Sequence, residues 1–183
     1  MNEPWYRKLF GRSTHSTLEA AQARASQGDA DAQFGLGLRC SSGNEEARDY
    51  PQAAQWYLKA ADQSHALAQF NLGIMYTRGQ GVPQDDAQAL QWFRKAAQQG
   101  DAGAQFNLGL CLHRASVARL QADPLESKIE AYKWFHLAAN QGYQGSIAAF
   151  ETLTLSLTRE QVTDGNQRVA AFLVETAKHS RNQ

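Results

Sequence analysis

Few side chains in this 183-residue sequence suggest chemistry: five histidines, two cysteines and one pair of adjacent aspartates. No two histidines have the i, i+4 spacing that would place metal ligands on one helix face; they are His15, His65, His113, His136 and His179. Cys40 and Cys111 form no C-x-x-C pair and no Cys/His cluster, which excludes the usual zinc and redox motifs. We expect two buried thiols in helices and no metal site.

Catalytic motifs are missing from the sequence: it has no G-x-S-x-G, H-E-x-x-H or Walker A pattern. Gly79-Gln-Gly81 resembles the start of a G-x-G-x-x-G loop, but Gln84 replaces the third glycine, so we interpret the segment as a turn. Asp85 and Asp86 are adjacent and would point apart at a helix start, so helix capping explains them better than acid–base chemistry. We predict no catalytic residue, no cofactor and no small-molecule substrate.

Composition narrows the function classes further. Lys+Arg and Asp+Glu number 18 each, so the formal net charge is zero, whereas nucleic-acid binding proteins usually carry a surplus of basic charge. Mean hydropathy is −0.55, and no apolar run approaches the ~18 residues of a membrane-spanning helix. The 30 alanines and only 4 prolines favour helix. We therefore expect a helical protein that contacts neither nucleic acid nor a membrane.

The sequence contains a repeat of 36 residues, which sets where its helices and their side chains lie. The block Ala-Gln-Phe-x-Leu-Gly recurs with its alanine at Ala32, Ala68 and Ala104. A second block centred on tryptophan occupies 53–61, 89–97 and 131–139, the last copy delayed by a six-residue insertion. Both blocks have apolar residues at helical spacing, so each unit predicts two helices, and a period of this length is typical of a helical solenoid.

Residues that begin and end helices recur with the same period. We predict N-caps at Asp49, Asp85 and Asp123, with Asp123-x-x-Glu126 acting as a capping box. Left-handed residues are predicted after the second helices, at Gly28, Ser64, Gly100 and Gly142. A glycine inside each first helix indicates close helix–helix approach; these are Gly37, Gly73 and Gly109.

Residues 68–100 carry the pattern A-x-x-x-L-G-x-x-Y-x-x-G-x-G-V-x-x-D-x-x-x-A-x-x-W-x-x-x-A-A-x-x-G, which resembles the Sel1-like repeat, a relative of the tetratricopeptide repeat. The resemblance implies an all-α, right-handed solenoid of helical hairpins. We expect an N-terminal arm at 1–15, a solenoid over 16–157, a capping helix at 158–178 and a tail at 179–183. Within the solenoid we expect a half repeat at 16–30, repeats at about 31–66, 67–102 and 103–143, and a partial repeat at 144–157. On the capping helix, Val162, Val169, Phe172 and Leu173 should face inward.

The resemblance also implies a function: a non-enzymatic adaptor that binds another protein or a peptide in a concave groove lined by the first helices. The predicted groove residues are Phe34, Leu38, Phe70, Asn71, Ile74, Thr77, Phe106, Asn107, Leu110 and His113, with Gly35 and Ser41 beside them. The three phenylalanines could instead pack neighbouring helices together. The insertion at 115–122 is a second candidate surface, and it should lengthen the first helix of the third repeat.

One alternative function depends on the N-terminal arm. Trp5, Leu9 and Phe10 alternate with basic residues there, so the arm could anchor a regulatory or effector module at an envelope or host membrane. A hydrolase acting on cell-wall or β-lactam substrates has been suggested for relatives, but no residue here supports it. The arm has no apolar core of a secretory signal, and the paired cysteines of secreted members are missing, so we expect a cytoplasmic protein.

Overall fold

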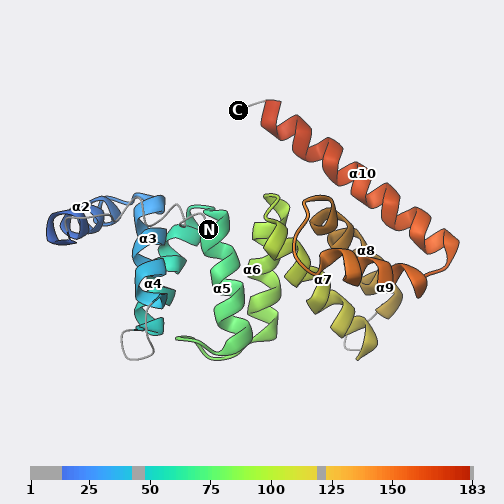
Figure 1. Ribbon diagram of the computed structural model, residues 1–183, viewed down its shortest axis with the longest axis horizontal. Helices are drawn as coiled ribbons and strands as arrows, with labels where there is room; N and C mark the ends of the chain where they lie inside the picture. The colour runs from blue at the N-terminus through green and yellow to red at the C-terminus, as the bar shows by residue number, and fades with distance from the viewer. Residues whose placement is uncertain (1–13, 43–47, 119–122, 182–183) are drawn as a thin grey trace. The chain divides into compact units, whose positions relative to one another are not determined.

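The computed structural model describes residues 14–42, 48–118 and 123–181, and every regular element in these ranges is an α-helix (Figure 1). The helices are α2 (Thr14–Ser26), α3 (Ala30–Ser41), α4 (Tyr50–Asp62), α5 (Ala66–Arg78), α6 (Asp86–Gln98), α7 (Ala102–Val117), α8 (Pro124–Asn140), α9 (Ser146–Leu155) and α10 (Arg159–Arg181). The predicted all-α class is confirmed. Most of the N-terminal arm lies outside the described residues, so the anchoring alternative stays a prediction.

The chain divides into two compact units, Met1–Ala89 and Leu90–Gln183. In the first unit α2 packs on α3, α3 pairs with α4, and α4 packs on α5. In the second unit α7 pairs with α8, and α8 contacts both α9 and α10. Within each unit a helix therefore contacts its neighbours along the chain, as expected of stacked hairpins.

The predicted N-caps are confirmed. The Oδ1 atom of Asp49 accepts a hydrogen bond from the Gln52 amide at 2.9 Å, and Asp85 and Asp123 cap α6 and α8 in the same way. The capping box at Asp123 is incomplete: the Glu126 amide donates to Asp123, but the Glu126 carboxylate accepts hydrogen bonds from Arg168 instead. These caps satisfy amides that the first turn of a helix cannot satisfy internally.

The second helices end as predicted, with a left-handed residue two positions after each. The φ angle is +96° at Gly28, +92° at Gly100 and +70° at Gly142, and Ser64 adopts +64° at the same repeat position. The next residue then returns a backbone hydrogen bond to the helix; the Asp101 amide, for example, donates to the Ala96 carbonyl. Each such turn directs the chain into the following first helix.

Close packing explains the glycines within the first helices. A Cβ atom placed on Gly37 would lie 2.7 Å from the Tyr57 ring, and one on Gly109 would lie 2.6 Å from the Phe135 ring. Both distances are shorter than carbon atoms tolerate, so the aromatic rings of α4 and α8 occupy the space of the missing side chains. The predicted close approach is confirmed at these two positions.

A lysine lies over the tryptophan of each second helix. The Nζ atom is 4.3 Å from the ring centre in the Lys59–Trp56 pair, 4.0 Å in Lys95–Trp92 and 4.4 Å in Lys133–Trp134. A cation over an indole face is attracted by the ring's quadrupole, by about 0.5–1 kcal/mol at exposed sites. The second helices α4, α6 and α8 thus share one polar feature as well as their apolar stripe.

Helix α10 begins with a complete capping box: the Thr158 amide donates to Gln161 Oε1 and the Gln161 amide donates to Thr158 Oγ1. Val169 is buried and the Phe172 ring meets Trp134 of α8 edge-on at 5.4 Å, as the prediction of an inward face requires. Leu173 contradicts that prediction, because it is 49% exposed. The C-terminal turns of α10 extend away from α8 (Figure 1).

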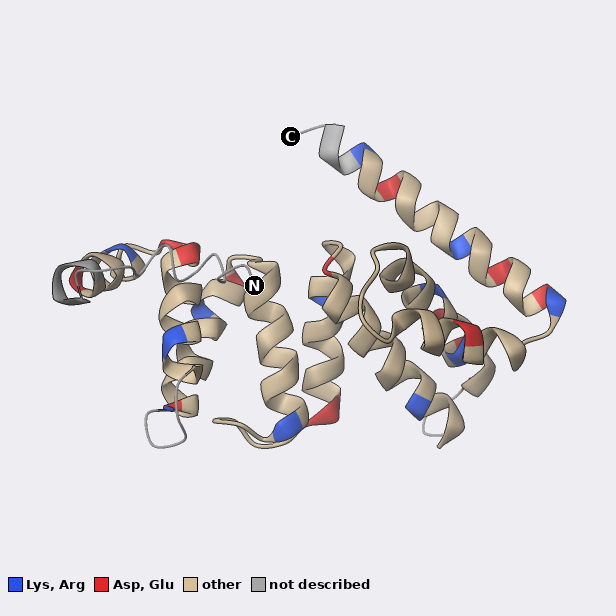
Figure 2. Ribbon diagram, viewed as in Figure 1, with Lys and Arg blue, Asp and Glu red and all other residues tan. Residues whose placement is uncertain are grey.

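One arginine ties α10 to α8. Arg168 donates hydrogen bonds to Glu126 and Glu130 of α8 and to Asp164 one turn earlier on α10. The bonds to Glu126 and Asp164 raise the pKa of Arg168 above its already high ordinary value, so the side chain stays cationic. Figure 2 shows charges of both signs along α10. The ion pairs of Arg168 with Glu126 and Glu130 connect α10 to α8.

The contact at Gly109 predicts the effect of adding one methyl group. Alanine normally stabilises a helix over glycine by about 1 kcal/mol, but Gly109→Ala should destabilise this protein by about 2 kcal/mol, since the Phe135 ring must move. Urea unfolding followed by circular dichroism measures the difference. The double variant Gly109→Ala/Phe135→Leu should lose less than the two single changes together; full additivity would contradict the contact.

The cluster at Arg168 predicts how firmly α10 is held. Arg168→Met should lower the free energy of unfolding by about 2 kcal/mol, because it leaves three neighbouring carboxylates without their shared cation. Thermal unfolding measures the loss, and the loss should shrink at high salt. Arg159→Met, at the exposed start of α10, is the matched control and should change stability by less than about 0.5 kcal/mol. Equal effects of the two changes would contradict this role of Arg168.

Candidate partner-binding surface

The predicted groove residues lie on the first helices, α3, α5 and α7, in the same order on each. Although these residues occupy equivalent positions on the three helices, their contacts differ. Four groups follow from the contacts: rings packed at joints between repeats, amides bound within their own helix, hydroxyls turned inward or along the helix, and aliphatic side chains that reach the surface.

The phenylalanine rings pack at joints between repeats. Phe34 is only 5% exposed, stacks on His65 with ring centres 4.6 Å apart, and meets Tyr57 at 5.7 Å. Phe106 is half-buried and meets Phe135 at 5.7 Å and Tyr143 at 5.4 Å. In both units the phenylalanine therefore contacts the second helix of its repeat and a residue that precedes the next first helix.

This packing corrects the prediction for two positions. Phe34 is not an exposed groove residue, and most of the Phe106 ring is used within the fold. The phenylalanine recurs every 36 residues, as the sequence shows. This spacing is expected both of residues that pack repeats together and of residues that line a groove, so it does not distinguish the two roles. Phe70 is half-buried at the corresponding position of α5.

The two asparagines use their amide groups locally. The Asn71 side chain donates to the Leu67 carbonyl and the Asn107 side chain donates to the Gly103 carbonyl, both at 2.8 Å. The Thr77 hydroxyl likewise donates to the Gly73 carbonyl at 2.8 Å. A partner backbone would therefore meet amide groups whose orientation is already fixed.

Ser41 does not face outward. Its hydroxyl lies 2.9 Å from the Tyr57 hydroxyl, within hydrogen-bond distance. Burial raises the pKa of Tyr57 to about 12, and the hydrogen bond with Ser41 opposes only part of that shift. At neutral pH the Tyr57 hydroxyl therefore keeps its proton.

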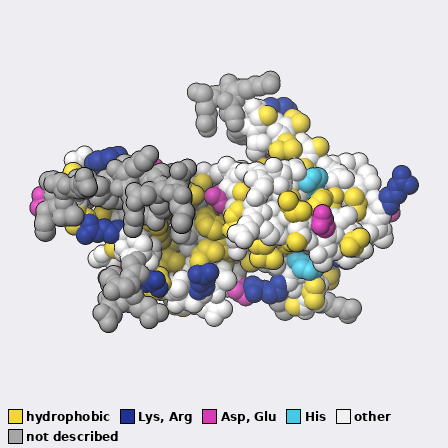
Figure 3. Space-filling model, viewed as in Figure 1, with side chains coloured by type: hydrophobic (Ala, Val, Ile, Leu, Met, Phe, Trp, Pro, Cys, Tyr) yellow, Lys and Arg dark blue, Asp and Glu magenta, His cyan; other side chains and the backbone are white. Residues whose placement is uncertain are grey.

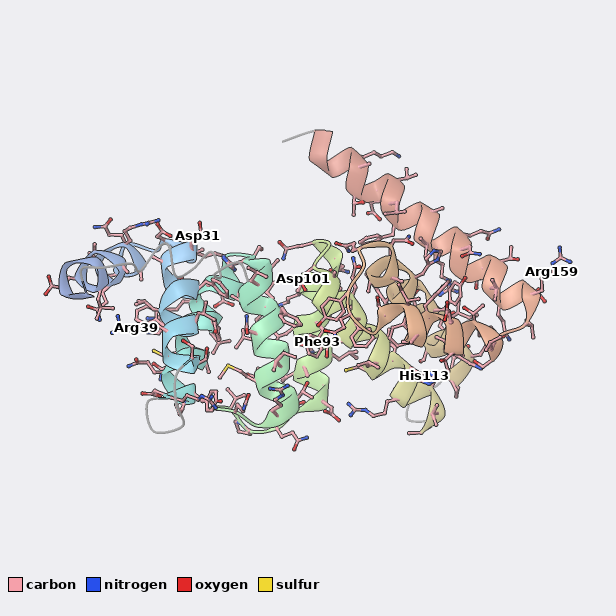
Figure 4. The ribbon with its side chains drawn as sticks, in the orientation of Figure 1. Asp31, Arg39, Phe93, Asp101, His113 and Arg159 are labelled. Atoms are coloured by element: carbon pink, nitrogen blue, oxygen red, sulfur yellow. The ribbon has the colours of Figure 1, made fainter. Side chains whose placement is uncertain are left out.

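The side chains that do reach the surface are aliphatic. Leu110 of α7 is 42% exposed, and Leu38 of α3 and Ile74 of α5 are half-buried. His113 lies on α7 well beyond Asp101, as the labels in Figure 4 show; it is half-buried, and its Nδ1 atom is buried with no hydrogen-bond partner among the described residues. On each first helix we call these residues its part of the first-helix face: Leu38 on α3; Asn71, Ile74 and Thr77 on α5; and Asn107, Leu110 and His113 on α7.

The first-helix face has no charge along most of its length. Helix α5 carries no charged side chain before Arg78, and α7 carries none before Arg114 (Figure 2). In the part of the chain that the structure describes, no three His, Cys, Asp or Glu side chains are grouped as metal ligands. The face offers apolar contacts, side-chain amides and the imidazole of His113.

Both cysteines lie in helices, as predicted, but they are half-buried rather than fully buried. The Cys40 thiol donates to Gln52 Oε1 at 2.9 Å. Burial raises the pKa of Cys40, with a further contribution from the Asp49 carboxylate, so the thiolate is disfavoured.

The insertion of the third repeat behaves partly as predicted. Helix α7 runs to Val117, three residues beyond the corresponding end of α5, while residues 119–122 lie outside the description. Val117 is 71% exposed and Leu125, in the first turn of α8, is 46% exposed. These two apolar side chains keep this region a second candidate surface.

A buried glutamine in each first helix carries a role that the sequence prediction missed. Gln33, Gln69 and Gln105 are at most 5% exposed, and each side chain donates to the carbonyl of the last alanine of the preceding second helix. These carbonyls belong to Ala25, Ala61 and Ala97. A polar residue repeated at one position of an alanine-rich buried block is the signal that could have revealed it.

The same glutamines also accept hydrogen bonds. Gln63 donates to Gln33 Oε1 at 2.8 Å, and Gln141 donates to Gln105 Oε1 at 2.9 Å. Gln63 and Gln141 follow the second helices α4 and α8. The buried amide of each of these glutamines thus connects two segments: the second helix of the preceding repeat and the residue that follows the second helix of its own repeat.

Comparisons with known proteins identify the repeat. The family described as Sel1 repeat matches residues 30–65, 66–101 and 102–143. No match was found among curated proteins. A solved structure of a protective antigen present in uropathogenic Escherichia coli strains, which displays an SLR fold, superposes with a TM-score of 0.61 at 23% identity over 95% of this chain. The chain spans only 45% of that antigen.

A second solved structure, of a Sel1 repeat protein from Oxalobacter formigenes, superposes with a TM-score of 0.59 at 29% identity. It covers 74% of this chain and 97% of its own length. Both structures share the helical-hairpin solenoid with this chain. Among the residues described for this protein, no helix combines the length and the apolar content needed to cross a membrane.

The buried amide at Gln105 predicts a cost for removing it. Gln105→Leu keeps the volume but leaves Gln141 and the Ala97 carbonyl short of a partner, so the free energy of unfolding should fall by about 2 kcal/mol. Urea unfolding measures the change. Gln98→Leu, on the exposed side of α6, is the matched control and should cost less than about 0.5 kcal/mol. A loss no larger than that of the control would show that the Gln105 amide does not stabilise the fold.

Proposed function

Because this chain belongs to the Sel1 repeat family, we propose that it is a non-enzymatic adaptor that binds another protein or a peptide along its first-helix face. Sel1 repeats generally form protein–protein interaction scaffolds and are typically non-catalytic. The finer proposal, that the binding site is the concave side formed by the first helices, is supported by the exposure of Leu110. That side chain lies one turn after Phe106, which is engaged within the fold.

The chemistry of the face favours one kind of partner. Its exposed groups are aliphatic side chains and amides, and its helices are uncharged over most of their length. An extended segment with apolar side chains would bury the former and pair its backbone with the latter. We therefore propose an uncharged, extended stretch of a partner protein as the ligand, rather than an acidic or basic one.

We also propose the cytoplasm of a bacterium as the site of action. Cys40 and Cys111 form no disulfide in the described part of the chain, as suits a reducing compartment, and both structural relatives described above come from bacteria. The same face would serve an adaptor in any reducing compartment, so the location does not affect the binding proposal.

Capture of the partner tests the face. A variant carrying Ile74→Ser, Asn107→Ala and Leu110→Ser should retain at least tenfold less partner than wild type from native lysate, because truncating central apolar contacts costs about 1–2 kcal/mol each. The control variant Leu173→Ser/Val174→Ser changes two exposed side chains of α10, where hydrophobic side chains are visible in Figure 3, and should bind like wild type.

Circular dichroism and thermal melting establish that both variants fold. Equal capture by wild type and the first-helix variant would exclude the face as the binding site. Loss in the α10 variant alone would place the partner on that helix instead.

A further inference from the structure

The residues that open the first helices are not chemically equal. Asp29 and Asp101 cap α3 and α7, accepting from the Ala32 amide at 2.9 Å and the Ala104 amide at 2.6 Å. At the same repeat position His65 caps α5, and its Nδ1 atom accepts from the Ala68 amide at 3.2 Å. A carboxylate offers several acceptor sites, whereas an imidazole accepts at Nδ1 only while that nitrogen carries no proton.

The imidazole of His65 is held in place by two further contacts. Its ring stacks on the buried Phe34 with an interplanar angle of 24°. Its Nε2 atom lies 3.2 Å from Asp31 Oδ1, and only 15% of the His65 side chain is exposed. Since Nδ1 accepts, the ring proton is on Nε2, which points to the Asp31 carboxylate. Figure 4 labels Asp31 near the start of α3.

Stacking and capping are separate roles at this position. Tyr143 occupies the corresponding place against Phe106, but α9 begins after Gly145 and has no side-chain cap. The His65 ring therefore does two things: it stacks on Phe34 of the first hairpin, and it caps α5, the next first helix. Among the described residues, stacking and capping by one side chain are found together at His65.

Few other charged groups face the imidazole. Asp31 is the charged residue that contacts it from α3. On α4, Lys59 lies over Trp56 and Asp62 is exposed in the last turn; on α5 the charged residue is Arg78, at the opposite end. Asp29 is paired with Arg24 of α2.

We propose that His65 makes the joint between the first and second repeats sensitive to pH. At lower pH a proton from solvent binds the Nδ1 lone pair. The nitrogen then presents an N–H to the Ala68 amide, the cap is lost, and the imidazolium lies at the positive end of the α5 dipole. The first turn of α5 opens, while α3 and α7 keep their carboxylate caps. This inference does not depend on the identity of a partner.

Amide and imidazole NMR signals followed from pH 7.5 to pH 5.0 test the proposal in the wild-type protein. The Ala68 amide should shift with the same midpoint as the His65 ring, whereas the Ala32 and Ala104 amides should not follow that midpoint. An Ala68 amide that stays fixed while the His65 ring titrates would overturn the proposal.

A variant provides a second measurement. His65→Asn keeps a capping side chain that does not titrate. Relative to this variant, the folding equilibrium constant of wild type should fall about fivefold between pH 7.5 and pH 5.0, the value of one helix cap. A constant ratio would overturn the proposal. A rising ratio would also overturn it, because attraction between imidazolium and Asp31 would then outweigh the lost cap.

Discussion

A buried side-chain amide sets the geometry of each hairpin in this protein. Gln33 and Gln105 donate to the carbonyl of a preceding helix and accept from a glutamine that follows their own second helix. A buried amide left without partners costs more than most apolar contacts return, so the helices must keep the distances that these bonds require. The glycines that admit Tyr57 and Phe135, and the alanines around them, allow helices to approach within those distances.

The proposed binding surface consists of the side chains that this packing leaves accessible. Because Phe34 and Phe106 fill the joints between repeats, the side chains one turn later, Leu38 and Leu110, become the apolar groups available on α3 and α7. Stability and recognition thus use adjacent turns of the same helix. A different partner would then require substitutions at Leu38 and Leu110 but not at Phe34 and Phe106. Such a division is consistent with scaffold proteins that share a fold and differ in the residues that contact their partners.

The architecture can be predicted from the sequence because the residues that begin and end each helix act over short distances along the chain. The N-cap aspartates and the left-handed residues after the second helices depend on residues within a few positions of one another, and the structure confirms them. The direction of Phe34 was not predictable, because recurrence at 36 residues is required equally of a joint and of a groove. Leu173 was assigned wrongly for a related reason: α10 is apolar on its inner side, but the pattern does not tell how far α8 extends beneath it.

The lysine-covered tryptophans have a practical consequence. Trp56, Trp92 and Trp134 stand in the second helices of three successive repeats, each under its own ammonium group. Indole fluorescence depends on nearby charge and on exposure to water, so every repeat contains a natural optical reporter. Chains in which Trp5 is replaced and only one of these three tryptophans is retained would reveal whether the array loses its hairpins together or one after another from an end.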